Sequence, residues 1–163
     1  MAAAIGAIVM LGCAGFRSDI LAFTLAAAAA PLLGWAAIGL LHIHGDARTR
    51  TMSIGFWITE VGVFLLAAGY LVAALGAAGG NESLIDNASQ AAIAPGFLVF
   101  LPIGLGLFGL AAWQIGTLGA WKRLLPSLTA AGGVLAPQLM LLGFAALGFV
   151  MATHNRDPGP SAG

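Results

Sequence analysis

The sequence predicts an all-α membrane protein: a polytopic bundle of four to five transmembrane helices. Of its 163 residues, 60% are hydrophobic and only 7% are charged, whereas charged residues make up about a quarter of an ordinary soluble domain. So few charges could not cover a surface in water, but they suit the bilayer interior. The alternation of polar and apolar residues typical of membrane barrels is missing, and backbone groups in lipid must bond internally, which favours helices.

Short polar segments divide the chain into five apolar stretches. These stretches are 1–16, 20–44, 53–79, 92–117 and 127–152. Each of the last four exceeds the roughly 20 residues that cross about 30 Å of hydrocarbon. We therefore expect a single transmembrane domain over residues 1–153, followed by a disordered tail at 154–163.

The first apolar stretch is the shortest, with a length of about 24 Å as a helix. We favour a short or tilted transmembrane helix there. A cleaved signal peptide normally begins with basic residues, and Met1 to Met10 contains none. A lipoprotein site at Cys13 is suggested by the Gly-Cys pair, but Leu11 is bulky where a small residue is expected. Cys13 is the single cysteine, so an internal disulfide is excluded.

The charged residues of the connections predict the orientation in a bacterial inner membrane. The 45–52 and 118–126 connections each carry two basic residues, whereas the 80–91 connection carries only acidic ones. Basic connections remain on the cytoplasmic side. We therefore expect 45–52, 118–126 and the N-terminus inside, with 80–91 and the C-terminus outside.

Small residues recur at four-residue spacing, a pattern that lets transmembrane helices approach closely. The stripes are Ala22, Ala26, Ala30 and Gly34; Gly69, Ala73 and Ala77; and Ala112, Gly116 and Ala120. They predict the contact surfaces of a compact bundle or a homo-oligomer. Proline adds kinks or helix starts, at Pro31, Pro95, Pro102 and Pro137.

A faint internal repeat joins the two halves of the chain. The 33–37 and 108–112 segments are alike, each is followed by Ile-Gly, and the same relation pairs Glu60 with Gln138 after small gaps. One explanation is a parallel duplication of a helical hairpin, as in some transporters. The other is chance similarity in a chain rich in Ala, Gly and Leu.

The C-terminal third carries a resemblance to other proteins. Its residues are the apolar run 104–116, the Trp- and Arg-containing turn at 118–125, and the Ala-Ala-Gly-Gly of 130–133. This arrangement resembles a group of small actinobacterial polytopic membrane proteins that have no assigned function. The resemblance implies a membrane protein. It implies no particular activity, because that group has no assigned function.

Three polar residues inside the predicted spans are the main functional candidates. Glu60 lies about two turns into its helix, and a carboxylate there costs a few kcal/mol unless it is paired or protonated. Gln114 is expected at similar depth and Gln138 nearer mid-membrane, where both could bond Glu60. One hypothesis is a proton- or cation-coupled site. The other is polar contacts that tie helices or subunits together, worth roughly 1 kcal/mol each.

The histidines and tryptophans near the predicted membrane surface are expected to be interfacial. His42 and His44 point in different directions on a helix and cannot form one ligand pair, so we expect neither a metal nor a haem cofactor there. Trp57 and Trp121 flank the basic connections, where an aromatic belt is typical.

These features favour a structural or accessory subunit of a larger membrane assembly, or a small homo-oligomer, without a catalytic site. The alternative is a small proton- or cation-coupled transporter or channel that uses Glu60, Gln114 and Gln138. An enzyme is the less favoured class, because Cys13 has no nearby base in the sequence and Ser53 and Ser127 lie next to predicted helix starts, where capping explains them. The expected partners are the lipid bilayer and membrane subunits. A zero net charge gives no support for nucleic acid.

Overall fold

The computed structural model describes residues 1–13, 18–45, 48–115, 124–135 and 137–154. Only the backbone is described at positions 43, 134, 137, 151, 152 and 154. Within these ranges the chain is helical apart from short turns, and no strand occurs. The predicted all-α class is therefore confirmed for the described residues.

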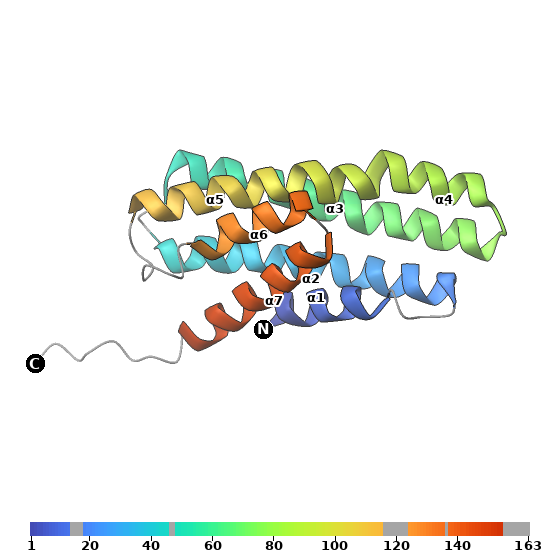
Figure 1. Ribbon diagram of the computed structural model, residues 1–163, viewed down its shortest axis with the longest axis horizontal. Helices are drawn as coiled ribbons and strands as arrows, with labels where there is room; N and C mark the ends of the chain where they lie inside the picture. The colour runs from blue at the N-terminus through green and yellow to red at the C-terminus, as the bar shows by residue number, and fades with distance from the viewer. Residues whose placement is uncertain (14–17, 46–47, 116–123, 136, 155–163) are drawn as a thin grey trace, which may run out of the picture.

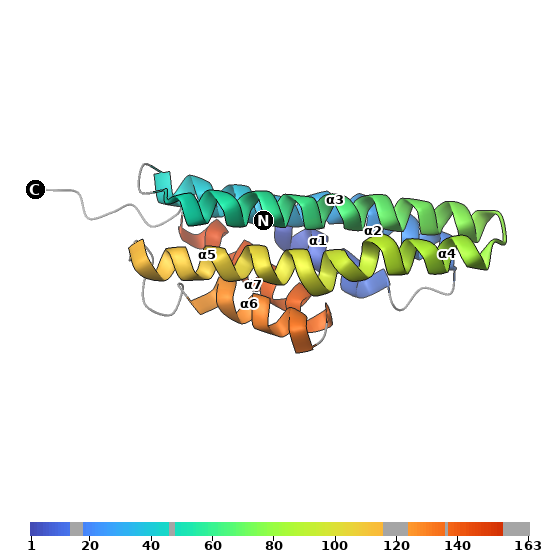
Figure 2. The ribbon, with the colours of Figure 1, turned by 90° about the horizontal axis from the view of Figure 1, so that it is seen from above.

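Three helices are long and apolar enough to cross a membrane. They are α2 (Asp19–His44), α3 (Arg50–Ala78) and a continuous helix from Glu82 to Ile115. The last comprises α4 (Glu82–Ala88), two π-helical stretches, η2 (Ser89–Ile93) and η3 (Gly96–Phe100), and α5 (Leu101–Ile115). The long helices lie side by side along the molecule (Figures 1 and 2).

The other helices are shorter, and five full-length spans are not what the structure shows. α1 (Ala2–Cys13) has only 12 residues, and the predicted helix 127–152 is two helices, α6 (Leu124–Leu135) and α7 (Pro137–His154). They are antiparallel, since Gly132 packs on Leu139 and Gly143 packs on Thr129. Proline lacks a backbone N–H group and clashes with the preceding helical turn, so it interrupts a helix but is accepted at a helix start. Accordingly, α7 begins at Pro137.

The predicted outer connection 80–91 is mostly helix, which corrects the predicted helix start at residue 92. The turn needs only two glycines, and Gly80 adopts a φ of 64°. The side-chain oxygen of Asn81 accepts a hydrogen bond from the Leu84 backbone N–H at 3.1 Å and so caps α4. Polar residues that suggested a loop therefore form a capped helix end.

The predicted positions of the chain ends also change. α7 ends at the end of the bundle that carries the α2–α3 connection (Figure 1), whereas the sequence placed the C-terminus opposite that connection. The amino group of Met1 lies near mid-length and donates to the Gly148 carbonyl at 3.4 Å, rather than lying beside the 45–52 connection. The 155–163 tail and the 118–123 part of the second connection lie outside the described residues.

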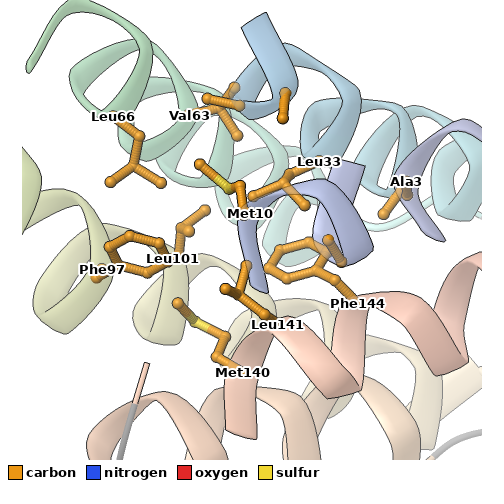
Figure 3. Packing of buried hydrophobic residues seen from close by; sticks show 14 of the residues in the cluster. Ala3, Met10, Leu33, Val63, Leu66, Phe97, Leu101, Met140, Leu141 and Phe144 are labelled. Carbon is orange, nitrogen blue, oxygen red and sulfur yellow. The ribbon is translucent and has the colours of Figure 1, made fainter. Parts of the chain in front are cut away.

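The core lies where the short helices cover the long ones. Figure 3 shows Leu33 of α2, Leu101 of α5 and Phe144 of α7 converging, and all three are fully buried. Trp35 and Trp113 lie deeper in the predicted spans than Trp57, so the sequence predicts that they pack between helices, but both are 58% exposed on the outer surface. Which side chains are buried depends on which face of each helix turns toward the core. Hydrophobicity alone did not reveal that face, because the inner and outer faces of these helices are both apolar.

The predicted small-residue contacts are confirmed within the described residues. Ala30 and Ala73 are completely buried, and Gly34 and Gly69 pack closely against neighbouring helices. The proposed hairpin duplication finds no such support, because its last helix, predicted at 127–152, is divided into α6 and α7, whereas the corresponding helix α3 is continuous over 29 residues.

Candidate functional site

Glu60 lies at the seam between α2 and α3, directly over Gly34. A Cβ atom placed on Gly34 would lie 3.0 Å from Oε1 of Glu60 and 3.1 Å from Oε2. Glycine therefore makes room for the carboxyl group on the neighbouring helix. Because α3 begins at Arg50, Glu60 is about 15 Å along the axis from the helix start, deeper than the sequence predicted.

The Glu60 carboxyl group combines a buried atom with an exposed apolar setting. Oε1 is buried and has no hydrogen-bond partner in the described part of the chain, while the side chain as a whole is only half-buried. Around the helix surface beside it, Trp57 is 67% exposed and Phe64 is 71% exposed. Burying a polar oxygen without a hydrogen-bond partner in apolar surroundings costs about 1–3 kcal/mol of free energy. Protonation of the Glu60 carboxyl group, or a hydrogen-bond donor from outside the seam, would therefore stabilise it.

The two glutamines do not join Glu60. Thr59, the neighbour of Glu60, packs on Gly104 of α5, and Gln114 lies ten residues further along that helix, about 15 Å away. Gln138 lines a cavity with Tyr70, which is ten residues beyond Glu60 on α3. Both glutamines are exposed. The three residues therefore occupy three separate places.

The two histidines behave differently from each other. His42 is exposed, whereas His44 is 3% exposed and its Nδ1 lies 2.7 Å from the Leu40 carbonyl oxygen. Nε2 of His44 is buried without a hydrogen-bond partner in the described part of the chain. Among the described residues, no three His, Cys, Asp or Glu side chains are grouped as metal ligands. Trp121 lies outside the described residues.

A further set of polar contacts was not predicted: hydroxyl side chains that face glycine on the next helix. The pairs are Thr59 with Gly104, Ser127 with Gly109, and Thr129 with Gly143. Thr59 and Thr129 each donate to a carbonyl of their own helix, at 2.9 and 2.7 Å. Their hydroxyl groups are thus satisfied locally, and Glu60 differs because one of its oxygens is not.

No family model, no curated protein and no solved structure matches the chain. The functional argument therefore depends on the geometry of these residues.

Proposed function

We propose that the protein is an accessory subunit of a larger membrane assembly and that its partner docks on the α2–α3 seam at Glu60. The observation that carries the proposal is the buried Oε1 of Glu60, which has no hydrogen-bond partner among the described residues and lies on an otherwise apolar surface. A carboxyl group in the hydrocarbon region is costly unless it is paired. A helix from another subunit supplies the missing partner.

The expected partner group is a cation or a hydrogen-bond donor within a transmembrane helix. This chain has six Lys and Arg residues, and none falls inside the predicted apolar spans 20–44, 53–79, 92–117 and 127–152. A second copy therefore has no basic side chain to offer at the depth of Glu60. Another subunit that carries Arg or Lys within a transmembrane helix fits the seam better.

The apolar surroundings of Glu60 also support docking. Trp57, Val61 and Phe64 expose between 44% and 71% of their surface on one side of α3, which provides a broad contact area around the carboxyl group. Large aromatic side chains around one polar group are typical of the energetically important centre of an interface. The separation of Glu60, Gln114 and Gln138 gives less support to a transport path through the monomer.

Photo-crosslinking in the native membrane tests this proposal. A photoreactive residue at Val61, next to Glu60, is expected to form an adduct with a different membrane protein. The same residue at Leu128 of α6, which is 62% exposed, serves as the control for an apolar surface without a carboxyl group. Glu60→Ala is expected to reduce the Val61 adduct at least fivefold.

Two results contradict the accessory role. Adducts from Val61 that contain only lipid would show that no protein covers the seam. Adducts between two copies of this chain would replace the accessory role by a homo-oligomer. Native mass spectrometry of the gently extracted protein provides an independent check, since the same partner should accompany the wild-type chain.

A further inference from the structure

A cavity ten residues further along α3 than Glu60, at Tyr70, suggests a ligand site that is separate from the Glu60 carboxyl group. Its volume is about 250 Å³, and its walls come from α1, α2, α3, η3 and α7. Its described lining residues are within or beside the apolar helices and include no Asp, Glu, Lys or Arg. The site therefore suits an uncharged molecule that reaches it through the lipid phase.

Two polar groups point to more than a hydrocarbon ligand. Tyr70 offers a hydroxyl group and Gln138 an amide group, and both can donate hydrogen bonds. Neither side chain forms a hydrogen bond within the described part of the chain. Tyr70 is half-buried and Gln138 is exposed. Of the two donors that line the cavity, Gln138 is therefore the more accessible from the surface.

Aromatic rings form part of the same wall. The rings of Phe23 and Tyr70 are stacked with centroids 6.4 Å apart and an interplanar angle of 29°, and Phe97 contributes a third ring. Figure 3 shows Phe97, Met10 and Leu141, which also line the cavity, in the same part of the core around Leu101. Flat apolar surfaces beside hydrogen-bond donors suit a planar ring that bears carbonyl oxygens.

The backbone at the cavity is also irregular. Phe97 belongs to η3, a π-helical stretch that follows Pro95. Such stretches are rare within helices and are frequent at functional sites. Here the irregular turn supplies one of the aromatic walls.

From these observations we infer that the cavity binds the head group of a membrane quinone, with its carbonyl oxygens accepting hydrogen bonds from Tyr70 and Gln138. A phospholipid head group is a poorer match, because no charged side chain lines the described cavity. An acyl chain alone would leave both donors without acceptors, which costs free energy in an apolar site.

Cys13 provides a direct test, because it lines the cavity and is the single cysteine in the chain. The purified protein is labelled with N-ethylmaleimide in the presence of decylubiquinone, whose fully substituted ring does not add a thiol. The quinone is expected to slow Cys13 labelling at least fivefold, measured by mass spectrometry. Decylbenzene, which has the same tail and no carbonyl group, is expected to have little effect.

Variants separate the two donors from general packing. Tyr70→Phe and Gln138→Leu are each expected to raise the quinone concentration for half-protection about fivefold, which corresponds to a hydrogen bond of roughly 1 kcal/mol. Gln114→Leu is the matched control, because Gln114 is an exposed glutamine that does not line the cavity. It should leave protection unchanged.

Equal protection by decylbenzene and decylubiquinone would overturn the quinone assignment in favour of an acyl-chain site. Absence of protection by either compound would overturn it as well. If Cys13 proves unreactive in the free protein, native mass spectrometry replaces the labelling, and one bound quinone that is lost in Tyr70→Phe is the expected result. None of these outcomes depends on a partner at Glu60.

Discussion

Helix α3 has two interfaces that are built in different ways. Toward α4 and α5 it presents glycines at seven-residue spacing: Gly55, Gly62, Gly69 and Gly76. Toward α2 it presents the Glu60 carboxyl group, and the glycine at that point, Gly34, belongs to the other helix. The first interface is completed by backbone contact within the chain, whereas the second leaves Oε1 of Glu60 without a partner in the part of the chain that the structure describes.

The glycine interface has the geometry of a closed contact. A Cβ atom on Gly55 would lie 2.8 Å from the Gly104 carbonyl oxygen, and one on Gly69 would lie 2.7 Å from a side-chain carbon of Ile93. A seven-residue repeat corresponds to 3.5 residues per turn and keeps one face of a helix against its neighbour over its whole length. Small residues at such positions are a major source of helix association in lipid.

Substitution at the glycine interface should have the largest effect on stability. A Cβ atom on Gly104 would lie 2.7 Å from the backbone nitrogen of Thr59 and 2.9 Å from the Gly55 carbonyl oxygen, and backbone atoms cannot rotate away. We expect Gly104→Leu to lower the free energy of unfolding by about 3 kcal/mol through overpacking. Unfolding in sodium dodecyl sulfate, followed by circular dichroism, measures this change.

Gly12→Leu is the control for that measurement, because a Cβ atom on Gly12 would meet no atom of the described residues within 4 Å. It should not destabilise the protein, since leucine also favours helix over glycine. Equal losses for the two variants would show that α3 and α5 do not approach as closely as the structure indicates.

The sequence contained enough information for the helical class and for part of the glycine interface. The spacing of Gly55, Gly62, Gly69 and Gly76 is visible along the chain, but the predicted stripes of small residues have four-residue spacing and include only Gly69 of this set. The seven-residue spacing is the pattern that identifies all four glycines. The approximate extents of α2 and α3 followed from hydrophobicity, because polar residues do mark their ends.

Other features depended on contacts that the sequence does not specify. Depth along a helix suggested that Glu60 and Gln114 meet, but the register places Gly104 beside Thr59 and leaves Gln114 near the helix end. The division of 127–152 into two helices was also missed, because α6 and α7 are equally apolar. Residue 136 between them lies outside the described ranges.

Removal of the Glu60 carboxyl group should give the second-largest effect, with opposite signs in two measurements. In the isolated subunit, Glu60→Leu removes the buried oxygen without a partner, and we expect the free energy of unfolding to rise by about 1–2 kcal/mol. In the native membrane the same change should release the partner subunit. The partner is measured by co-purification.

Glu82→Leu is the charge-removal control, because Glu82 is an exposed acidic residue at the start of α4. It should change neither subunit stability nor partner recovery appreciably. A loss of stability in the isolated Glu60→Leu subunit would mean that the carboxyl group is already satisfied within the chain.

The hydroxyl–glycine contacts should contribute smaller amounts. Thr59→Val keeps the shape of a fully buried side chain but removes its hydrogen bond to the Gly55 carbonyl, and we expect a loss of about 0.5–1 kcal/mol. Thr129→Val removes the equivalent bond to Leu125 beside Gly143 and should cost a similar amount. A much larger loss for Thr59 alone, in the same unfolding assay, would show that its hydroxyl group also bonds across the α3–α5 interface.

The smallest effect on subunit stability should come from Gly34→Ala. The new methyl group would lie 3.0 and 3.1 Å from the two Glu60 oxygens, but these atoms end a flexible side chain and can rotate outward. Alanine gains about 1 kcal/mol of helix propensity over glycine, and displacing the Glu60 carboxyl group offsets most of this gain, so the free energy of unfolding should change by less than about 0.5 kcal/mol. The displaced carboxyl group should nevertheless reduce partner crosslinking from Val61. Strong destabilisation would instead mean that the α2–α3 seam is as closed as the glycine interface, which would remove the structural reason for a partner at Glu60.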